Sequence, residues 1–378
     1  MKFETRAIHD GQKPDALTGS VIVPVYQTST YQQDAIGRHK GYEYSRTGNP
    51  TRKALEDVLA SLEDGKYGLA FASGVAATSA VFHLLEKDAH IIVGDDVYGG
   101  TYRLIEKVFG RWGLKATYVN ADDINSFQKA VQENTKLIWI ETPTNPLLKI
   151  IDIKNLSKIA RKKNILLVVD NTFASPYFQK PLVFGADIVV HSTTKYLAGH
   201  SDIIGGAVIT SNKSIYENLK FYQNAAGAVP GPWDSWLVIR GIKTLAIRMK
   251  EHEKNALYLA EYLEKHPKIE RVYYPGLPSN KYYDIAKRQM TGFGGMISIE
   301  LKGGFPAVEK FVSKLKIFLL AESLGGVESL VCYPVKMTHA AFPAEERKKR
   351  GISDSLIRLS VGIEDKDDLK NDIEQALK

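Results

Sequence analysis

The chain has 378 residues, 44% of them hydrophobic and 25% charged, and its 50 Lys and Arg against 43 Asp and Glu give a formal net charge of +7. This length suits two globular domains, and the basic residues are spread along the chain, which excludes the basic tail or stripe of a nucleic-acid-binding protein. The single cysteine, Cys332, excludes an intramolecular disulfide and a cysteine-based zinc site; because we find no signal core at the start and no run of about 18 apolar residues, we expect a cytoplasmic protein without a membrane span.

The first 54 residues are expected to form an extended arm. The segment "TGSVIVPVYQTSTYQQDAIGRHKGYEYSRTGNPT" is rich in Gly, Pro, Thr and Tyr and lacks helical periodicity. An arm of this length cannot bury its apolar residues on itself. We therefore expect it to lie on a neighbouring surface, such as another subunit.

Residues 55–243 are expected to form an α/β domain. An amphipathic helix with one apolar face is predicted to begin at Thr51. Short apolar strands and helices alternate along the chain after it. The strand patterns are "YGLAFASG", "AHIIVGDD", "LKATYVN", "KLIWIETP", "ILLVVDNT" and "ADIVVHS". Short, nearly continuous apolar strands between amphipathic helices are typical of a mainly parallel sheet that is covered on both faces.

Residues 244–378 are expected to form a smaller α+β domain. It opens with one long predicted helix, "TLAIRMKEHEKNALYLAEYLEKHP", which links it to the sheet domain. Strand-like segments such as "GGMISIEL" and "LIRLSVGIE" follow, with Gly-rich joints.

Polar residues follow several of the predicted strands of the first domain. In open parallel sheets, ligands bind beyond the carboxyl ends of the strands, so these residues should converge. Gly74 and Val75 open a helix whose free N–H groups favour an anion, and Ser192 and Thr194 can add hydroxyl donors. This group predicts a phosphate site.

Three further side chains at the same edge suggest the rest of the ligand. Tyr98 offers a ring that can stack on a planar molecule, and Asp170 ends an apolar strand where it needs a cationic partner. Lys195 can supply a nucleophilic amine. A phosphate, a planar ring, a protonated ring nitrogen and an aldehyde captured by lysine together describe pyridoxal 5′-phosphate. A nucleotide is the alternative, although the fingerprints G-x-G-x-x-G and G-x-x-x-x-G-K-[ST] are absent.

The motifs "YEYSRTGNPTR", "FASGVAA", "DDVYGGTYRL", "ETPTNPLLK", "VVDNTFASPYFQKPL", "HSTTKYLAGHSD", "AESLGGVESL" and "LIRLSVGIED" occur in this order along the chain. In them the sequence resembles the Cys/Met-metabolism pyridoxal-phosphate enzymes from end to end. The resemblance implies an aspartate-aminotransferase-like fold (fold type I). It also implies a homotetramer, a dimer of dimers with active sites shared across each dimer. The charge distribution and the lack of long apolar runs lead us to expect no nucleic-acid and no membrane partner.

The resemblance also implies roles for individual residues. Lys195 would bind the cofactor aldehyde and carry protons, Asp170 would face the pyridine nitrogen, and Tyr98 would stack on the ring and act as an acid–base group. The remaining cofactor contacts would come from Gly74, Val75, Ser192 and Thr194, and, from the arm of the adjacent subunit, Tyr44 and Arg46. The substrate would be bound by Asn145, Ser323, Arg358, Glu322 and Arg103, with no metal.

The resemblance leaves the reaction open between two activities. Glu322 is suited to the distal amino group of cystathionine, and Gly100 stands where methionine γ-lyases carry a cysteine. We expect cystathionine γ-lyase activity, which releases cysteine, 2-oxobutanoate and ammonia. The alternative is cystathionine γ-synthase activity, which replaces the acyl group of an O-acylhomoserine by cysteine. A catalytically silent binding relative is a further alternative, against which Lys195, Asp170 and Arg358 argue.

Overall fold

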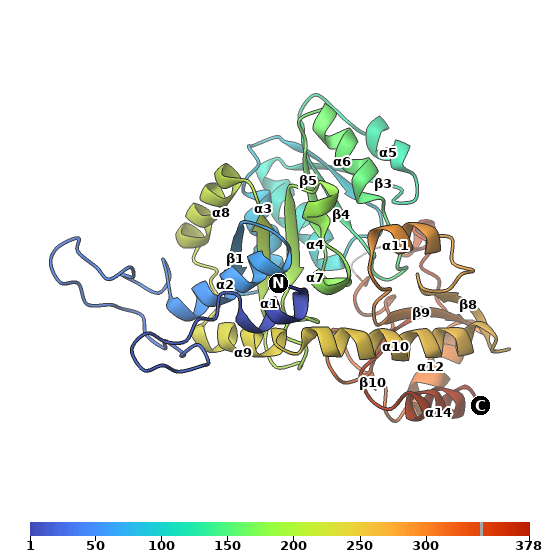
Figure 1. The fold of residues 1–378 in the computed structure, drawn as a ribbon. Coiled ribbons are helices and arrows are strands. Elements are labelled where there is room, and N and C mark those ends of the chain that lie inside the picture. The colour runs from blue at the N-terminus through green and yellow to red at the C-terminus, as the bar shows by residue number, and fades with distance from the viewer. Residues whose placement is uncertain (341–342) are drawn as a thin grey trace.

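The computed structural model describes residues 1–340 and 343–378 and contains two β-sheets joined by a long helix (Figure 1). The first sheet has the order β1-β7-β6-β5-β4-β2-β3. Its strands are β1 (Tyr67–Phe71), β2 (His90–Gly94), β3 (Lys115–Val119), β4 (Thr135–Glu141), β5 (Leu166–Asp170), β6 (Ile188–Ser192) and β7 (Gly206–Thr210). The pairings from β3 to β6 are parallel, whereas β7 is antiparallel to both β1 and β6. The predicted mainly parallel sheet is therefore confirmed; β7 was not anticipated.

The helices of this region follow the strands as the alternation predicted. They are α2 (Pro50–Leu62), α3 (Gly74–Phe82), α4 (Gly99–Arg103), the π-helical turn η1 (Leu104–Val108), the 3-10 turn η2 (Phe109–Trp112), α5 (Ile124–Lys129), α6 (Ile153–Lys162), α7 (Ser175–Phe178), the 3-10 turn η3 (Pro181–Phe184), α8 (Lys213–Ala226) and α9 (Pro232–Ile242). Polar side chains fix where several of them begin. Asn49 accepts hydrogen bonds from the first amides of α2, and Asp152 caps α6 in the same way.

The N-terminal segment differs in part from the predicted arm. A short helix, α1 (Phe3–His9), lies at its start and contacts α2; Ala7 is buried there, and Arg6 pairs with Asp64. These tertiary contacts stabilise a helix too short to show periodicity in the sequence. The chain that follows extends away from the sheet as the dark-blue trace in Figure 1, and it leaves Leu17 and Ile36 exposed.

The C-terminal region is built around a second sheet, with the order β10-β11-β12-β9-β8. It is reached through α10 (Leu245–Glu264), which extends from the first sheet to the second (Figure 1). The other elements are β8 (Ile269–Tyr273), α11 (Tyr283–Gln289), β9 (Met296–Leu301), α12 (Gly304–Lys314), β10 (Leu319–Leu320), β11 (Leu330–Cys332), α13 (Ala344–Lys349), β12 (Leu356–Ser360) and α14 (Lys366–Leu377). Strands and helices mix as expected. The boundaries at residues 54 and 243 stay predictions.

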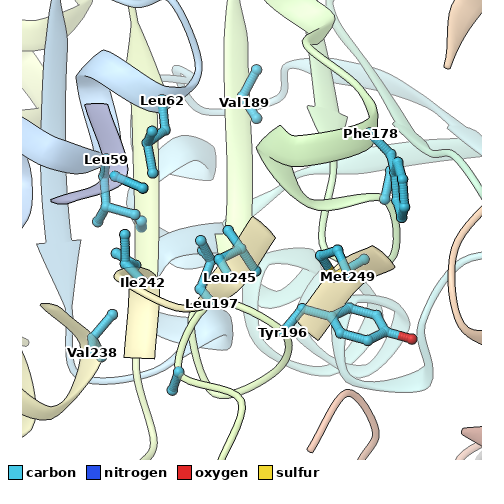
Figure 2. Packing of buried hydrophobic residues seen from close by; sticks show 14 of the residues in the cluster. Leu59, Leu62, Phe178, Val189, Tyr196, Leu197, Val238, Ile242, Leu245 and Met249 are labelled. Carbon is cyan, nitrogen blue, oxygen red and sulfur yellow. The ribbon is translucent and has the colours of Figure 1, made fainter. Parts of the chain in front are cut away.

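A hydrophobic cluster lies between the first sheet and the helices α2, α9 and α10. Figure 2 shows Leu59 and Leu62 of α2 gathered with Val189 of β6 and Leu245 of α10. Tyr196, which directly follows Lys195, is fully buried in the same cluster. The cluster therefore anchors the chain immediately after the candidate lysine and limits where its amine can point.

Residues 1–340 and 343–378 show neither a membrane-spanning helix nor a cluster of metal ligands. No helix there combines the length and apolar content needed to cross a bilayer. No group of three or more potential metal-binding side chains was found in the same residues.

Candidate active site

A cavity of about 570 Å³ opens at the carboxyl ends of the strands in the first sheet. It contains most of the side chains that the sequence analysis selected. From the first sheet and its helices these are Gly74, Val75, Tyr98, Asn145, Asp170, Ser192, Thr194 and Lys195, and from the C-terminal region Glu322, Ser323 and Arg358. The convergence expected at this edge of the sheet is thus present, and the C-terminal region forms the opposite wall.

Lys195 lies at the centre of this group. Its Nζ donates a hydrogen bond to Ser323 Oγ at 2.7 Å. Burial and the nearby positive charge of Arg358 lower the pKa of Lys195 to about 8, although Glu322 opposes this shift. A substantial fraction of the amine is therefore neutral near physiological pH and able to attack a carbonyl carbon.

Asp170 ends β5 with its carboxyl group on the cavity wall. Its Oδ1 accepts a hydrogen bond from the backbone N–H of Thr172 at 3.0 Å. Burial raises the pKa of Asp170, whereas the hydrogen bonds of Thr172 and the charge of His191 act in the opposite direction. A carboxylate in this position is stabilised by a cation in the cavity, such as a protonated ring nitrogen.

The start of α3 forms a small cradle beside β6. Ser73 caps the helix by accepting a hydrogen bond from the N–H of Ala76. A Cβ atom at Gly74 would lie 2.9 Å from the Cβ of Ser192, so only glycine leaves room here. Free helix amides and the Ser192 hydroxyl suit a phosphate. The Thr194 hydroxyl bonds both backbone groups of Gly205, so it would have to reorient its proton toward an anion.

Tyr98 lies at the beginning of α4 and borders the cavity with 37% of its surface exposed. Its backbone N–H donates to Glu141 Oε1 at 2.9 Å. A Cβ atom at Gly100 would lie 2.3 Å from Tyr98 Cε1, so the missing side chain at Gly100 makes room for the ring. The backbone hydrogen bond of Tyr98 and the space left by Gly100 therefore determine where the ring lies.

Arg358 on β12 is almost completely buried. Its Nη1 donates to Asn145 Oδ1 at 2.7 Å and its Nη2 to the carbonyl oxygen of Ser323 at 2.9 Å. The Nε of Arg358 has no hydrogen-bond partner among the described residues. A buried donor without a partner suits a carboxylate ligand, because an unsatisfied polar group is costly.

Three of the predicted site residues do not line this cavity. Arg46 on the arm donates to the side chain of Asn224 at 2.9 Å and lies 5.5 Å from the ring centre of Tyr44. Their predicted contacts with the cofactor of an adjacent subunit stay predictions. Arg103 ends α4 and is exposed, so its predicted contact with substrate also stays a prediction.

The cavity also contains side chains to which the sequence analysis gave no role. They include Glu141, Thr172, Phe173 and Thr338. Glu141 follows the apolar run "LIWI" just as Asp170 follows "LLVV", so the sequence places it at this edge of the sheet without indicating what it does. Thr338, which reaches the cavity from the loop before α13, lies in "MTHA", a further segment in which the sequence resembles the family.

Helix amides beside a hydroxyl, a buried carboxyl group, an aromatic ring and an amine of lowered pKa are the kinds of group that bind pyridoxal 5′-phosphate in proteins. The donor types and the room at Gly74 fit this cofactor. The chain belongs to the Cys/Met metabolism PLP-dependent enzyme family, whose model matches residues 4–378. The predicted family, fold class and cofactor are therefore confirmed.

Similar proteins extend over nearly the whole chain. A cystathionine β-lyase from Coxiella burnetii is 56% identical, over 99% of this chain and 97% of that protein. A cystathionine γ-synthase from Mycobacterium tuberculosis is 51% identical, over 99% and 96%. The crystal structure of cystathionine γ-lyase from Lactobacillus plantarum complexed with L-serine has a TM-score of 0.97 and 51% identity, and it covers 100% of this chain and 98% of that one.

Proposed function

We propose that this enzyme is a cystathionine γ-lyase, which converts cystathionine and water into cysteine, 2-oxobutanoate and ammonia. The names of the three similar proteins support cystathionine as the compound that is processed. They differ in the reaction; the choice of a lyase over a synthase rests on the cavity, and the products of the assay below decide between γ- and β-elimination.

The observation that carries the proposal is the position of Glu322. This exposed carboxylate borders the same cavity as the Arg358 guanidinium. Cystathionine has an amino group and a carboxylate at each end. If Arg358 binds one carboxylate, Glu322 is suited to the ammonium group of the other end. The acyl group of an O-acylhomoserine has no ammonium group, so Glu322 favours cystathionine as the substrate that enters.

The chain's own residues divide the work of the reaction. Pyridoxal phosphate, when bound, supplies the aldehyde for the substrate amine and a ring that withdraws electrons from Cα. Arg358, held by Asn145 and Ser323, would orient the substrate carboxylate. Lys195 would take the proton from Cα and then move protons at Cβ, a task suited to a pKa of about 8. The Tyr98 hydroxyl would give a proton to the departing sulfur.

One comparison of products tests the proposal. The purified enzyme is incubated with cystathionine, and separately with O-acetyl- or O-succinylhomoserine plus cysteine. Release of 2-oxobutanoate and cysteine as the faster reaction supports γ-elimination. Pyruvate and homocysteine as the main products would mean β-elimination, and faster formation of cystathionine would mean the synthase; either result would replace the proposed activity.

A substitution tests the part given to Glu322. We expect Glu322→Gln to raise the KM for cystathionine about tenfold, since one charge pair is lost, with a smaller change in kcat. Glu217→Gln is the matched control, because Glu217 is also exposed, pairs with Lys213 on α8 and does not line the cavity. An unchanged KM in Glu322→Gln would remove the argument for cystathionine as the entering substrate.

We also propose a homotetrameric, cytoplasmic enzyme with three regions, residues 1–54, 55–243 and 244–378. The exposed apolar residues of the arm support an assembly, and so does the position of Arg46 outside the cavity of its own chain.

A further inference from the structure

Two acidic side chains lie next to each other at the end of the first sheet. Glu141 of β4 and Asp170 of β5 are register partners on adjacent parallel strands, so their side chains project from the same face. Both border the cavity, and Glu141 is 7% exposed. Only Asp170 has a role in the chemistry described so far.

Glu141 makes a specific contact with the loop that carries Tyr98. Its Oε1 accepts the hydrogen bond from the backbone N–H of Tyr98. Tyr98 precedes α4 and its own side chain does not cap that helix. The acceptor that fixes the start of this segment is therefore the carboxyl group of Glu141, across 43 residues of sequence.

The surroundings of Glu141 disfavour a negative charge on it. Its charged neighbours are Asp170 on β5 and Asp96 in the loop before α4, and both repel a charge on Glu141. In the described part of the chain, no lysine, arginine or histidine forms an ion pair with Glu141. The charge of Lys149 instead favours the ionised form of Asp96, and the charge of His191 favours the ionised form of Asp170.

The balance between the two carboxyl groups follows from these contacts. Burial, together with the charges of Asp170 and Asp96, raises the pKa of Glu141 well above its usual value, although the hydrogen bond from the Tyr98 N–H acts in the opposite direction. The hydrogen bonds from Thr172 and the charge of His191 favour the ionised form of Asp170. Two adjacent buried carboxylates do not both ionise readily, so the proton is expected on Glu141.

We propose that Glu141 is a positioning residue: as a neutral carboxylic acid, it holds the Tyr98 loop over the cofactor ring and leaves the single negative charge of the pair on Asp170. This inference uses the role proposed for Asp170 at the ring nitrogen. It is independent of which cystathionine reaction the enzyme catalyses.

Two substitutions of Glu141 separate the hydrogen bond from the charge. Glu141→Gln keeps an oxygen acceptor and remains neutral, so the Kd for pyridoxal phosphate should stay within about twofold of wild type. The pH titration of the bound cofactor's visible absorbance should also be unchanged. Glu141→Ala removes the acceptor, and we expect a Kd about tenfold higher and a weaker near-ultraviolet circular dichroism signal of the bound cofactor. An infrared band of a protonated carboxyl group should be present in wild type and missing in Glu141→Gln.

Glu253 provides a matched control. It is also a partly buried glutamate that accepts one backbone hydrogen bond, from Phe293 at 2.6 Å, and it does not border the cavity. Glu253→Ala should reduce stability without changing the Kd for pyridoxal phosphate.

Three outcomes would overturn the proposal. If Glu141→Gln binds the cofactor as weakly as Glu141→Ala, a neutral acceptor is insufficient. If its absorbance titration moves to lower pH, wild-type Glu141 carries the charge that stabilises the protonated cofactor. If Glu141→Ala binds as wild type does, the contact with Tyr98 has no positioning role. Cofactor binding by wild type is measured in the same series, so a failure of the proposed lyase activity would be seen separately.

Discussion

At the scale of single residues, Ser323 connects the two most important cations of the cavity. Its hydroxyl oxygen accepts the hydrogen bond from Lys195, and its carbonyl oxygen accepts one from Arg358. Its φ angle of 98° is unusual for a residue with a side chain. Such backbone strain persists where the surroundings impose it. The strained residue therefore sets the separation between the amine and the carboxylate-binding group.

Lys195 is expected to be indispensable. Lys195→Ala should abolish turnover and the visible absorbance of the lysine-bound cofactor, because no other amine can replace the missing nucleophile. Lys220→Ala is the control, since burial also lowers the pKa of Lys220 but it lies outside the cavity lining. Retained turnover in Lys195→Ala would reject the assigned role.

The pKa of Lys195 leads to a dependence on pH. The protonated amine cannot attack an aldehyde, and its pKa is lowered to about 8. The rate at which the cofactor-free protein captures pyridoxal phosphate should therefore rise with pH and level off above about 8. Stopped-flow absorbance at a series of pH values measures this midpoint. A midpoint near the usual lysine value would contradict the lowered pKa.

Gly100 is expected to control the Tyr98 ring. In Gly100→Ala the new methyl group would overlap the ring and displace it, so kcat/KM should fall about tenfold or more. Near-ultraviolet circular dichroism of the bound cofactor should report the displaced ring. Gly94→Ala is the control, because a Cβ atom there meets its nearest atoms at 3.8 Å, an ordinary contact. Equal kinetics in the two variants would reject steric control by Gly100.

The residues of the site were predictable to different degrees. Asp170, Ser192 and Lys195 follow apolar strands, and resemblance to a family added roles that the strand pattern alone cannot assign. The strained backbone of Ser323 and the partner of Glu141 were not predictable, since both depend on contacts between segments far apart in the chain. Sequence order does not reveal which neutral or charged form two adjacent acids adopt.

At the scale of elements, a buried contact between a histidine and a glutamate joins β6 to the segment after α2. His191 Nε2 lies 2.5 Å from Glu63 Oε1, and both side chains are about 1% exposed. Asn171, which follows β5, donates to the same oxygen at 2.8 Å. Glu63 therefore links the carboxyl ends of β5 and β6, the strands that carry Asp170 and Ser192.

Loss of this contact should destabilise the fold. His191→Ala removes one of the two contacts of the buried Glu63 Oε1 and leaves the one with Asn171, so the free energy of unfolding should fall by about 2 kcal/mol. Denaturant unfolding of the holoenzyme measures the change. His200→Ala is the control, because His200 is less buried and makes one backbone hydrogen bond, to Ala198 at 2.7 Å. Similar losses in both variants would contradict a special contribution from His191.

Periodicity predicted the central elements well, for a physical reason. The strands of the parallel sheet are buried on both faces, and α6 and α10 are long enough to repeat an apolar pattern. α1 and the three-residue strand β11 were not predicted, because tertiary contacts rather than local pattern stabilise such short elements.

At the scale of the whole molecule, the arm leaves the sheet and keeps apolar side chains such as Leu17 and Val21 exposed. Exposed apolar surface of this kind favours association with another chain. Tyr44 and Arg46 on the arm lie outside their own chain's cavity, and Arg46 is close to Asn224. A dimer in which each arm completes the partner's site accounts for both observations, and it predicts that catalytic groups can be supplied by different chains.

Mixing two inactive variants tests this prediction. Arg46→Ala should weaken cofactor retention, and Lys195→Ala should be inactive. In a hybrid dimer, one site combines the intact Lys195 of one chain with the intact Arg46 of the other, so up to about a quarter of wild-type activity should return after subunit exchange. Lys195→Ala mixed with Arg358→Ala is the control and should recover nothing, because these two residues belong to the same chain's cavity. Hybrids verified by native mass spectrometry that stay inactive would show that the arm does not complete a neighbouring site.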